Sequence, residues 1–372
     1  MTIMPTEDKL LLWAAGAFGG AAPAWMPARL GPVESARLVD RAAAEGMAGL
    51  LFRALKHHGC QGVATAEALD RLQSIYYLTI RTNVRHLAVL KEVFSEFNSN
   101  GIRAAVIQGL SLLLDLYPDP GLRPVSDIDL WVLPGELDRA SALLHGLGFG
   151  STLLYPRLFR KGDLLIDLRT QLMGGERIHA RRLLAKIDPR SIFENCRRLV
   201  YEGCGLRVLS PQDQALYLTL HAVKHNLERL VWLADLKRLV ADWKPLDWDA
   251  FAKRAAEFGQ LRLPAVMGHL LGLLPGGRPP EPLKADVRLS ALEKHLLRMR
   301  TRGALPKWSS LVLLRAGSGL KQAEYALESM FPRPAVLRQV FAGRDDLRDW
   351  QLYTLRVRQL MGMLRTAGRQ PS

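Results

Sequence analysis

Two carboxylates one residue apart, Asp127 and Asp129, lie in the segment SDIDLWVL and offer the clearest chemistry in the chain. The apolar residues that alternate with them predict a strand, so both carboxylates project from one face, about 7 Å apart along the strand. Two like charges this close are unfavourable unless a cation relieves them. Carboxylate oxygens suit Mg²⁺, which binds one or two protein carboxylates and keeps other positions for phosphate and water. The pair therefore predicts a Mg²⁺ or Mn²⁺ site that a substrate phosphate completes.

The residues upstream of this pair favour a metal and phosphate site over the alternative, an exposed edge strand or turn. Gly109 follows a short apolar strand and precedes a helical segment that contains Ser111. Backbone N–H groups at the start of a helix hold anions, and the serine hydroxyl adds a donor. Arg123, in the loop before the pair, could contact a triphosphate, and a solvent-facing loop position is equally compatible with the sequence.

A third carboxylate, Asp167, lies in the apolar segment DLLIDL and is expected to join the pair. The spacing from Asp129 leaves room for a helix and a neighbouring strand, so Asp167 can lie beside it. Three carboxylates around two cations can align an attacking oxygen with phosphorus and neutralise the leaving pyrophosphate. Asp163 is the competing candidate, but the adjacent Lys161 and Gly162 predict a turn there.

These segments carry a family resemblance. The order VIQGLSLLLDLYPDPGLRPVSDIDLWV, LLIDL and VLSPQDQALYLTLHAVKHNLERLVWLADLKRLV resembles the uncharacterised nucleotidyltransferase family of the polymerase-beta superfamily. The resemblance implies an α+β protein, with a small mixed-sheet, palm-like domain between mainly helical N- and C-terminal regions. It implies that Asp127 and Asp129 bind Mg²⁺ and that Asp167 is the third ligand and candidate base. The expected nucleotide-contacting residues are Gln108, Gly109, Ser111, Arg123 and Ser126.

The resemblance indicates one function, and the positions at which this sequence departs from the family pattern indicate a second. The first is Mg²⁺-dependent transfer of a nucleoside monophosphate from an NTP to an acceptor hydroxyl of a protein, a small molecule or an RNA end. The second is a weak or inactive relative that senses nucleotide or binds a partner. It is motivated by Gln108, where relatives often carry lysine, by Leu110 after the glycine, and by a longer gap to the first aspartate.

A second group of candidate residues lies in HAVKHNLERLVWLAD. His221 and His225 are four residues apart and share a helix face, with Asp235 expected further along the same helix. The zinc protease pattern HExxH is absent because Ala222 takes the place of glutamate. Packed histidines are one interpretation, and contact of His221, Lys224 or His225 with substrate is the other.

The elements that must position these residues can be read from periodicity and turn signals. Helical spacing predicts an N-terminal helical region over 1–100 and a helical domain over 206–274. The short apolar runs between them predict an α/β domain over 101–205, which the resemblance implies is nucleotidyltransferase-like. The proline- and glycine-rich stretch 275–284 predicts a linker. Residues 285–372 then form a basic helical region.

Composition limits the class of protein. The chain of 372 residues is 48% hydrophobic and 23% charged, as expected for a folded protein, with a net charge of +15 that favours anionic partners. Residues 285–372 hold 16 basic and 7 acidic residues, or +9, and are the candidate contact for a polyanion such as nucleic acid. Three cysteines without paired spacing suit a reducing cytoplasm. The glycine- and proline-interrupted stretch 10–28 predicts a short buried helix and a loop, not a membrane span.

Overall fold

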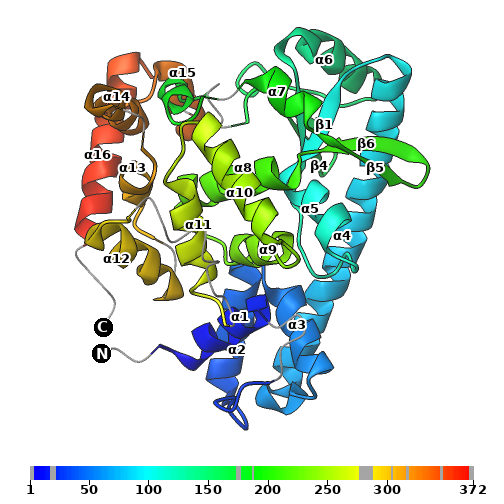
Figure 1. The fold of residues 1–372 in the computed structure, drawn as a ribbon, viewed down its shortest axis with the longest axis vertical. Coiled ribbons are helices and arrows are strands. Elements are labelled where there is room, and N and C mark those ends of the chain that lie inside the picture. Colours follow the sequence, from blue (N-terminus) through cyan, green and yellow to red (C-terminus); the bar gives the residue numbers. More distant parts are fainter. Residues whose placement is uncertain are drawn as a thin grey trace.

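The protein has an α+β fold in which helices surround a small mixed sheet (Figure 1). The fold class expected from the sequence is confirmed. The computed structural model describes the ranges 4–16, 22–172, 177–186, 188–275, 288–302, 305–315, 318–343 and 347–367.

The N-terminal region is helical, as its periodicity predicts. Its elements are α1 (Thr6–Gly16), α2 (Pro32–Ala44), α3 (Ala48–His57), the 3-10 helix η1 (Gln61–Val63) and α4 (Ala66–Ser99). The helix expected within 10–28 is α1, most of which is buried. Helix α4 begins at a capping threonine, because the Thr65 side chain accepts a hydrogen bond from the Ala68 N–H. Figure 1 shows α4 running along the side of the sheet region.

The central sheet has four strands in the order β1-β2-β4-β3. The strands are β1 (Ala104–Ile107), β2 (Ile128–Val132), β3 (Leu158–Lys161) and β4 (Leu164–Arg169). Strands β2 and β4 are parallel, and the other two pairs are antiparallel. Helix α5 (Gln108–Leu116) connects β1 to β2, whereas η2 (Pro134–Glu136) and α6 (Leu137–Gly146) lie between β2 and β3. The inner strands β2 and β4 therefore meet side by side with their ends in register.

A two-stranded hairpin follows the central sheet and was not expected from the sequence. Its strands are β5 (Arg197–Tyr201) and β6 (Cys204–Val208), preceded by η3 (His179–Leu183) and α7 (Pro189–Glu194). The turn between the strands holds Glu202 at φ 45° and Gly203 at φ 79°. Positive φ at both central residues is the geometry of a tight hairpin turn, in which glycine is favoured at the second position.

The first part of the helical domain predicted over 206–274 contains two helices. Helix α8 (Pro211–Lys224) begins after Ser210, whose side chain accepts a hydrogen bond from the Asp213 N–H. It ends where Asn226 and Leu227 adopt φ values of 53° and 52°, which no right-handed helix contains. The chain then re-enters a helix as α9 (Val231–Leu239). The prediction that Asp235 shares a helix with His221 and His225 is therefore wrong.

The rest of the described chain is helical. Its elements are α10 (Pro245–Glu257), α11 (Leu263–Leu271), α12 (Ala291–Met299), η5 (Arg300–Arg302), α13 (Ser309–Leu313), α14 (Gly319–Met330), α15 (Pro334–Val340) and α16 (Asp349–Ala367). Almost all of the predicted linker 275–284 lies outside the described residues, and the domain boundaries stay predictions. None of the described helices combines the length and the apolar character needed to cross a membrane.

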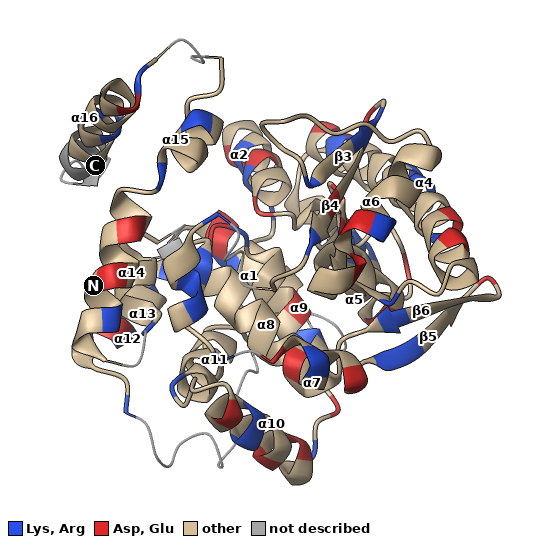
Figure 2. Cartoon of the chain, turned by 90° about the horizontal axis from the view of Figure 1, so that it is seen from above, with Lys and Arg blue, Asp and Glu red and all other residues tan. Residues whose placement is uncertain are grey.

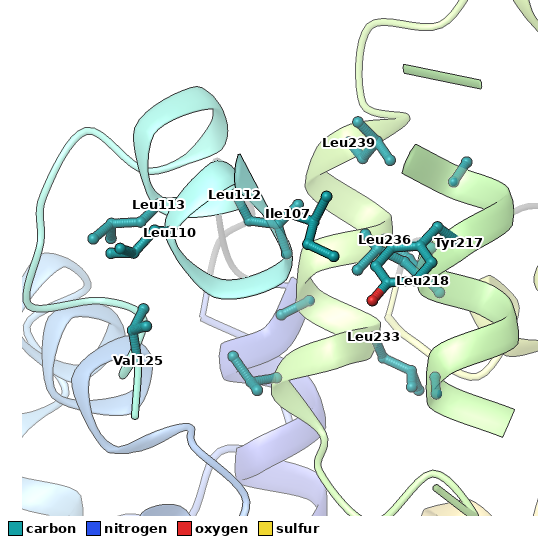
Figure 3. Packing of buried hydrophobic residues seen from close by; sticks show 14 of the residues in the cluster. Ile107, Leu110, Leu112, Leu113, Val125, Tyr217, Leu218, Leu233, Leu236 and Leu239 are labelled. Atoms are coloured by element: carbon teal, nitrogen blue, oxygen red, sulfur yellow. The ribbon is translucent and has the colours of Figure 1, made fainter. Parts of the chain in front are cut away.

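A shared hydrophobic core fixes α5 against both the sheet and the helical region. Figure 3 shows Ile107 and Leu112 on the side of α5 that faces α9, near Leu236. Leu110 and Leu113 point to the opposite side, toward Val125 in the loop before β2. Burial of such side chains stabilises the fold by roughly 1.5–3 kcal/mol each. The start of α5 is thereby held beside the ends of β1 and β2.

Candidate active site

The three aspartates expected from the sequence lie on neighbouring strands. Asp129 on β2 is paired in parallel register with Asp167 on β4. Asp127 precedes β2 by one residue and, by strand periodicity, shares a face with Asp129. Asp129 is only 4% exposed, whereas the other two are half-buried. The competing Asp163 lies in an exposed turn before β4, where Arg85 binds it at 2.6 Å.

An arginine that the sequence analysis missed joins two of these carboxylates. Nη2 of Arg169 lies 2.6 Å from Oδ1 of Asp129 and 2.6 Å from Oδ2 of Asp167. Its Nε also donates to Asp167 Oδ2 at 2.9 Å. The spacing could have revealed this contact, because residues two apart on a strand share a face. A single cationic nitrogen thus lies between the two strands.

Burial dominates the electrostatics of Asp129. Loss of solvent raises the pKa of this carboxyl well above its usual value, the Arg169 charge opposes that rise, and the Asp127 and Asp167 charges add to it. The pKa of Arg169 is raised in turn, because attraction to the carboxylates, above all Asp129, outweighs the cost of burying the guanidinium. The site therefore holds more acidic groups than this one arginine neutralises.

The turn before α5 places another donor on Asp129. Gln108 has φ 55°, a left-handed conformation uncommon outside glycine, and its Nε2 donates to Asp129 Oδ1 at 3.0 Å. The left-handed residue of this turn is therefore Gln108 and not Gly109. A Cβ at Gly109 would lie 2.9 Å from Val125 Cγ1, so glycine is required there for close packing. Ser111 is buried and donates its hydroxyl to the Gln108 carbonyl at 2.9 Å, which stabilises the turn.

Arg123 is not a loop residue that faces solvent. Its guanidinium is buried and donates to both oxygens of Asp235 on α9, with Nη2 at 2.9 Å from Oδ2. The hydroxyl of Tyr117 donates to Asp235 Oδ1 at 2.6 Å. The interpretation of Arg123 as a solvent-facing loop residue is wrong, because the side chain is buried, and its contact with a triphosphate stays a prediction. Ser126, in contrast, is exposed and donates to Asp127 at 2.9 Å.

One face of α8 lies toward the aspartates. Tyr217, His221, Lys224 and His225 recur at helical spacing, and the pKa of each is shifted mainly by burial, with a smaller contribution from the charge of Arg169. Burial lowers the pKa of Lys224 to about 7, helped by Arg181 and Arg169 and opposed by Asp129 and Asp167. Burial also lowers the pKa of His225 to about 3. Among the predicted residues His221, Lys224 and His225, Lys224 is the one whose pKa responds to the charges of Asp129 and Asp167.

The two histidines are packed in an aromatic cluster. Their ring centroids are 4.6 Å apart, and Trp232 of α9 lies 5.2 Å from His221. Asp235, which was expected on the same helix as the histidines, is engaged by Arg123. Within the described ranges, no set of three or more His, Cys, Asp or Glu side chains is arranged as a ready metal site. The packed interpretation of these histidines accounts for their positions.

Arginines of the basic C-terminal region are paired with carboxylates, both within that region and in the N-terminal region. Arg300 binds Glu45 near α2, and Arg338 binds Asp349 at 2.7 Å. Figure 2 shows blue and red residues interspersed over the C-terminal helices. Contact of 285–372 with a polyanion stays a prediction.

The comparisons with known proteins define the class. A family model described as "Uncharacterised nucleotidyltransferase" matches residues 31–274, more than half of the chain. The protein belongs to this family, and the resemblance read from its motifs is confirmed. Among solved structures, an antigenic nucleotidyltransferase-like protein from Paracoccidioides brasiliensis is similar at 13% identity and a TM-score of 0.31, over 54% of this chain and 96% of that chain. No curated protein matches the chain.

Proposed function

We propose that the protein is a nucleotidyltransferase that uses Mg²⁺ or Mn²⁺ to move a nucleoside monophosphate from an NTP to an acceptor hydroxyl, with release of pyrophosphate. The observation that carries this proposal is the register of Asp129 against Asp167, with Asp127 on the same face. Family membership supports the reaction class.

The donor set suits the metal. Oxygens of Asp129 and Asp167 lie 2.6 Å from one and the same nitrogen of Arg169, so the two carboxylates already converge on a point cation. Mg²⁺ commonly takes one or two protein carboxylates and completes its shell with phosphate and water. Asp129 and Asp167 would hold it, with Asp127 beside them. When bound, the metal would neutralise charge on the phosphates and orient them.

The chain's own residues would then divide the remaining work. Asp167, less buried than Asp129, is the candidate to accept the proton of the acceptor hydroxyl. Lys224 and Arg169 supply positive charge next to the carboxylates, where phosphate oxygens would lie. The α5 N-terminus has no side-chain cap, so its first backbone N–H groups are suited to an anion. Ser111 would hold the turn in shape through its bond to Gln108.

A second candidate function is a nucleotide-sensing or partner-binding relative without turnover. The observation that favours it is the engagement of Asp129 by both Arg169 and Gln108. In such a protein the guanidinium would stay between the carboxylates and take the place of a metal. It predicts nucleotide binding without transfer to any acceptor.

The test is label transfer from each α-³²P NTP in Mg²⁺ or Mn²⁺, with and without cell extract. Wild type is compared with Asp129→Asn and with the matched control Asp163→Asn, which alters an exposed aspartate four residues before Asp167. We expect transfer and pyrophosphate release from wild type and Asp163→Asn, and background levels from Asp129→Asn. Equal transfer by all three would refute the proposed site. Nucleotide binding without transfer in wild type would favour the sensing function.

A further inference from the structure

A cavity of about 330 Å³ is lined by Trp131 near the end of β2 and by residues that follow β4, so it lies further along both strands than Asp129 and Asp167. Trp131, Leu172 and Pro189 contribute apolar walls, and Arg181, Arg182 and Lys186 contribute positive charge. Among the described residues that line it there is no aspartate or glutamate. A pocket with an apolar body and three cations suits a small molecule that carries an anionic group.

Arg181 connects this cavity to the candidate active site. After burial, which is the largest cause, the charge of Arg181 contributes to lowering the pKa of Lys224 and of His225. Its Nε is buried and finds no hydrogen-bond partner within the described part of the chain. The nearby Glu328 uses both carboxylate oxygens on backbone N–H groups of η3, at 2.8 and 2.5 Å. A buried donor without a partner is expensive, and Arg181 also brings its positive charge to the wall of the cavity, where an anion would be attracted to it.

The position of the cavity along the strands sets the size of the molecule. Trp131 lies two residues beyond Asp129, and Thr170 three residues beyond Asp167, which corresponds to about 7–10 Å at roughly 3.3 Å per residue. The cavity volume equals that of roughly ten water molecules at about 30 Å³ each. A compound of sugar-phosphate size matches both this distance and this volume. Its anion would lie at the arginines and its hydroxyl at the carboxylates.

We infer that this cavity binds the acceptor, and that the acceptor is a small hydroxyl compound bearing a phosphate group. The inference rests on the proposed function. Three cations match a phosphate dianion better than a single carboxylate, and the arginine fork binds phosphate oxygens in pairs. In the reaction, the acceptor oxygen bonds to the α-phosphorus while the bond from that phosphorus to the pyrophosphate oxygen breaks. The hydroxyl proton passes to Asp167, and pyrophosphate leaves with the electron pair.

The experiment uses the full chain with α-³²P NTP and the small-molecule fraction of a cell extract, untreated or treated with a phosphatase that is removed before the assay. Arg181→Gln/Lys186→Gln tests the cavity, Arg181→Lys keeps one charge, and Arg198→Gln removes an exposed charge on β5 as the control. NTP binding and thermal unfolding are measured for each variant. Inorganic phosphate is titrated calorimetrically as a direct probe of the cavity.

We expect a labelled small molecule that phosphatase treatment abolishes. The double variant should lose labelling by at least about tenfold with NTP binding intact, because charge-assisted bonds to phosphate are lost. Arg181→Lys should recover part of it, and the control should match wild type. Label on macromolecules only, insensitivity to phosphatase, or an equal loss of NTP binding would overturn the acceptor assignment while leaving transfer established. If no fraction is labelled, the proposed function fails, and phosphate titration alone tests whether the cavity binds an anion. Phosphate binding that the double variant loses supports an anion site in the cavity. Phosphate binding that is absent, or unchanged in the double variant, overturns it.

Discussion

Two of the arginine–aspartate clusters in the described part of the fold differ in how completely their charges are satisfied. In the first, Arg123 and Asp235 are buried together, and Tyr117 completes the carboxylate. In the second, Arg169 is shared by Asp129 and Asp167, with Asp127 nearby. The first cluster is a closed unit, whereas the second has an excess of acidic groups and a half-exposed edge. The comparison distinguishes a structural ion pair from the proposed metal and nucleotide site.

The largest expected effect on stability comes from removal of the carboxylate in the first cluster. Asp235→Ala leaves the Arg123 guanidinium and the Tyr117 hydroxyl buried without their acceptor. Removal of one partner from a buried pair costs about 3–5 kcal/mol. We expect this loss in the free energy of unfolding, measured by denaturant titration. Asp163→Ala, which breaks only the exposed pair with Arg85, is the control and should leave the unfolding midpoint unchanged.

A substitution in the second cluster should reduce activity and leave stability intact. Asp129→Asn should cost about 10²-fold or more in transfer, as loss of a group that stabilises the transition state does. It should not lower stability, because the folded state disfavours the charged carboxylate. The sign follows from linkage: the pKa of Asp129 is raised on folding, so wild-type stability falls as pH rises from about 4. The part of this pH-dependent decrease in stability that comes from Asp129 should be absent in Asp129→Asn. Thermal unfolding in EDTA at different pH values measures it. A large loss of stability would place Asp129 with the structural pair.

The sequence supported one cluster far better than the other. Asp129 and Asp167 could be predicted because strand periodicity and apolar neighbours are local signals. The contact of Arg123 with Asp235 spans 112 residues and depends on the break after α8, where two non-glycine residues adopt positive φ. Local residue propensities predict neither this contact nor the break after α8. Arg169 lay within reach of sequence reasoning, since its spacing from Asp167 places it on the shared face.

The hairpin shows the same limit in another form. Its alternating residues and the Glu202–Gly203 turn were present in the sequence, as a local hairpin signal requires. This stretch falls mostly within the α/β domain predicted over 101–205, and the prediction did not include the hairpin. The fold class and the order of the main elements were therefore predictable, whereas the packing of α8 and α9 on the sheet required the tertiary structure.

Arg169 offers a way to sharpen the comparison. If its guanidinium lies where a cation is needed, then Arg169→Gln should strengthen Mn²⁺ binding by about tenfold, since a charge-assisted contact of about 1.5 kcal/mol or more no longer competes. Mn²⁺ binding is measured by electron paramagnetic resonance without nucleotide. Arg160→Gln, an exposed change on β3, is the matched control. Unchanged or weaker binding in Arg169→Gln would show that the arginine organises the carboxylates and does not compete with metal.

The smallest expected effect concerns the pH dependence of nucleotide binding. Burial brings the pKa of Lys224 to about 7, so its ammonium is lost as pH rises through neutrality. Arg181 and Arg169 favour that loss, whereas Asp129 and Asp167 oppose it. Because a bound triphosphate favours the ammonium, nucleotide binding should take up a proton and weaken severalfold between pH 6 and 8, taken as about one unit on either side of that value. Lys224→Arg keeps its charge throughout and should remove both effects. Calorimetry in buffers of different ionisation enthalpy measures the proton uptake directly, and equal uptake in wild type and Lys224→Arg would assign the titration to another group.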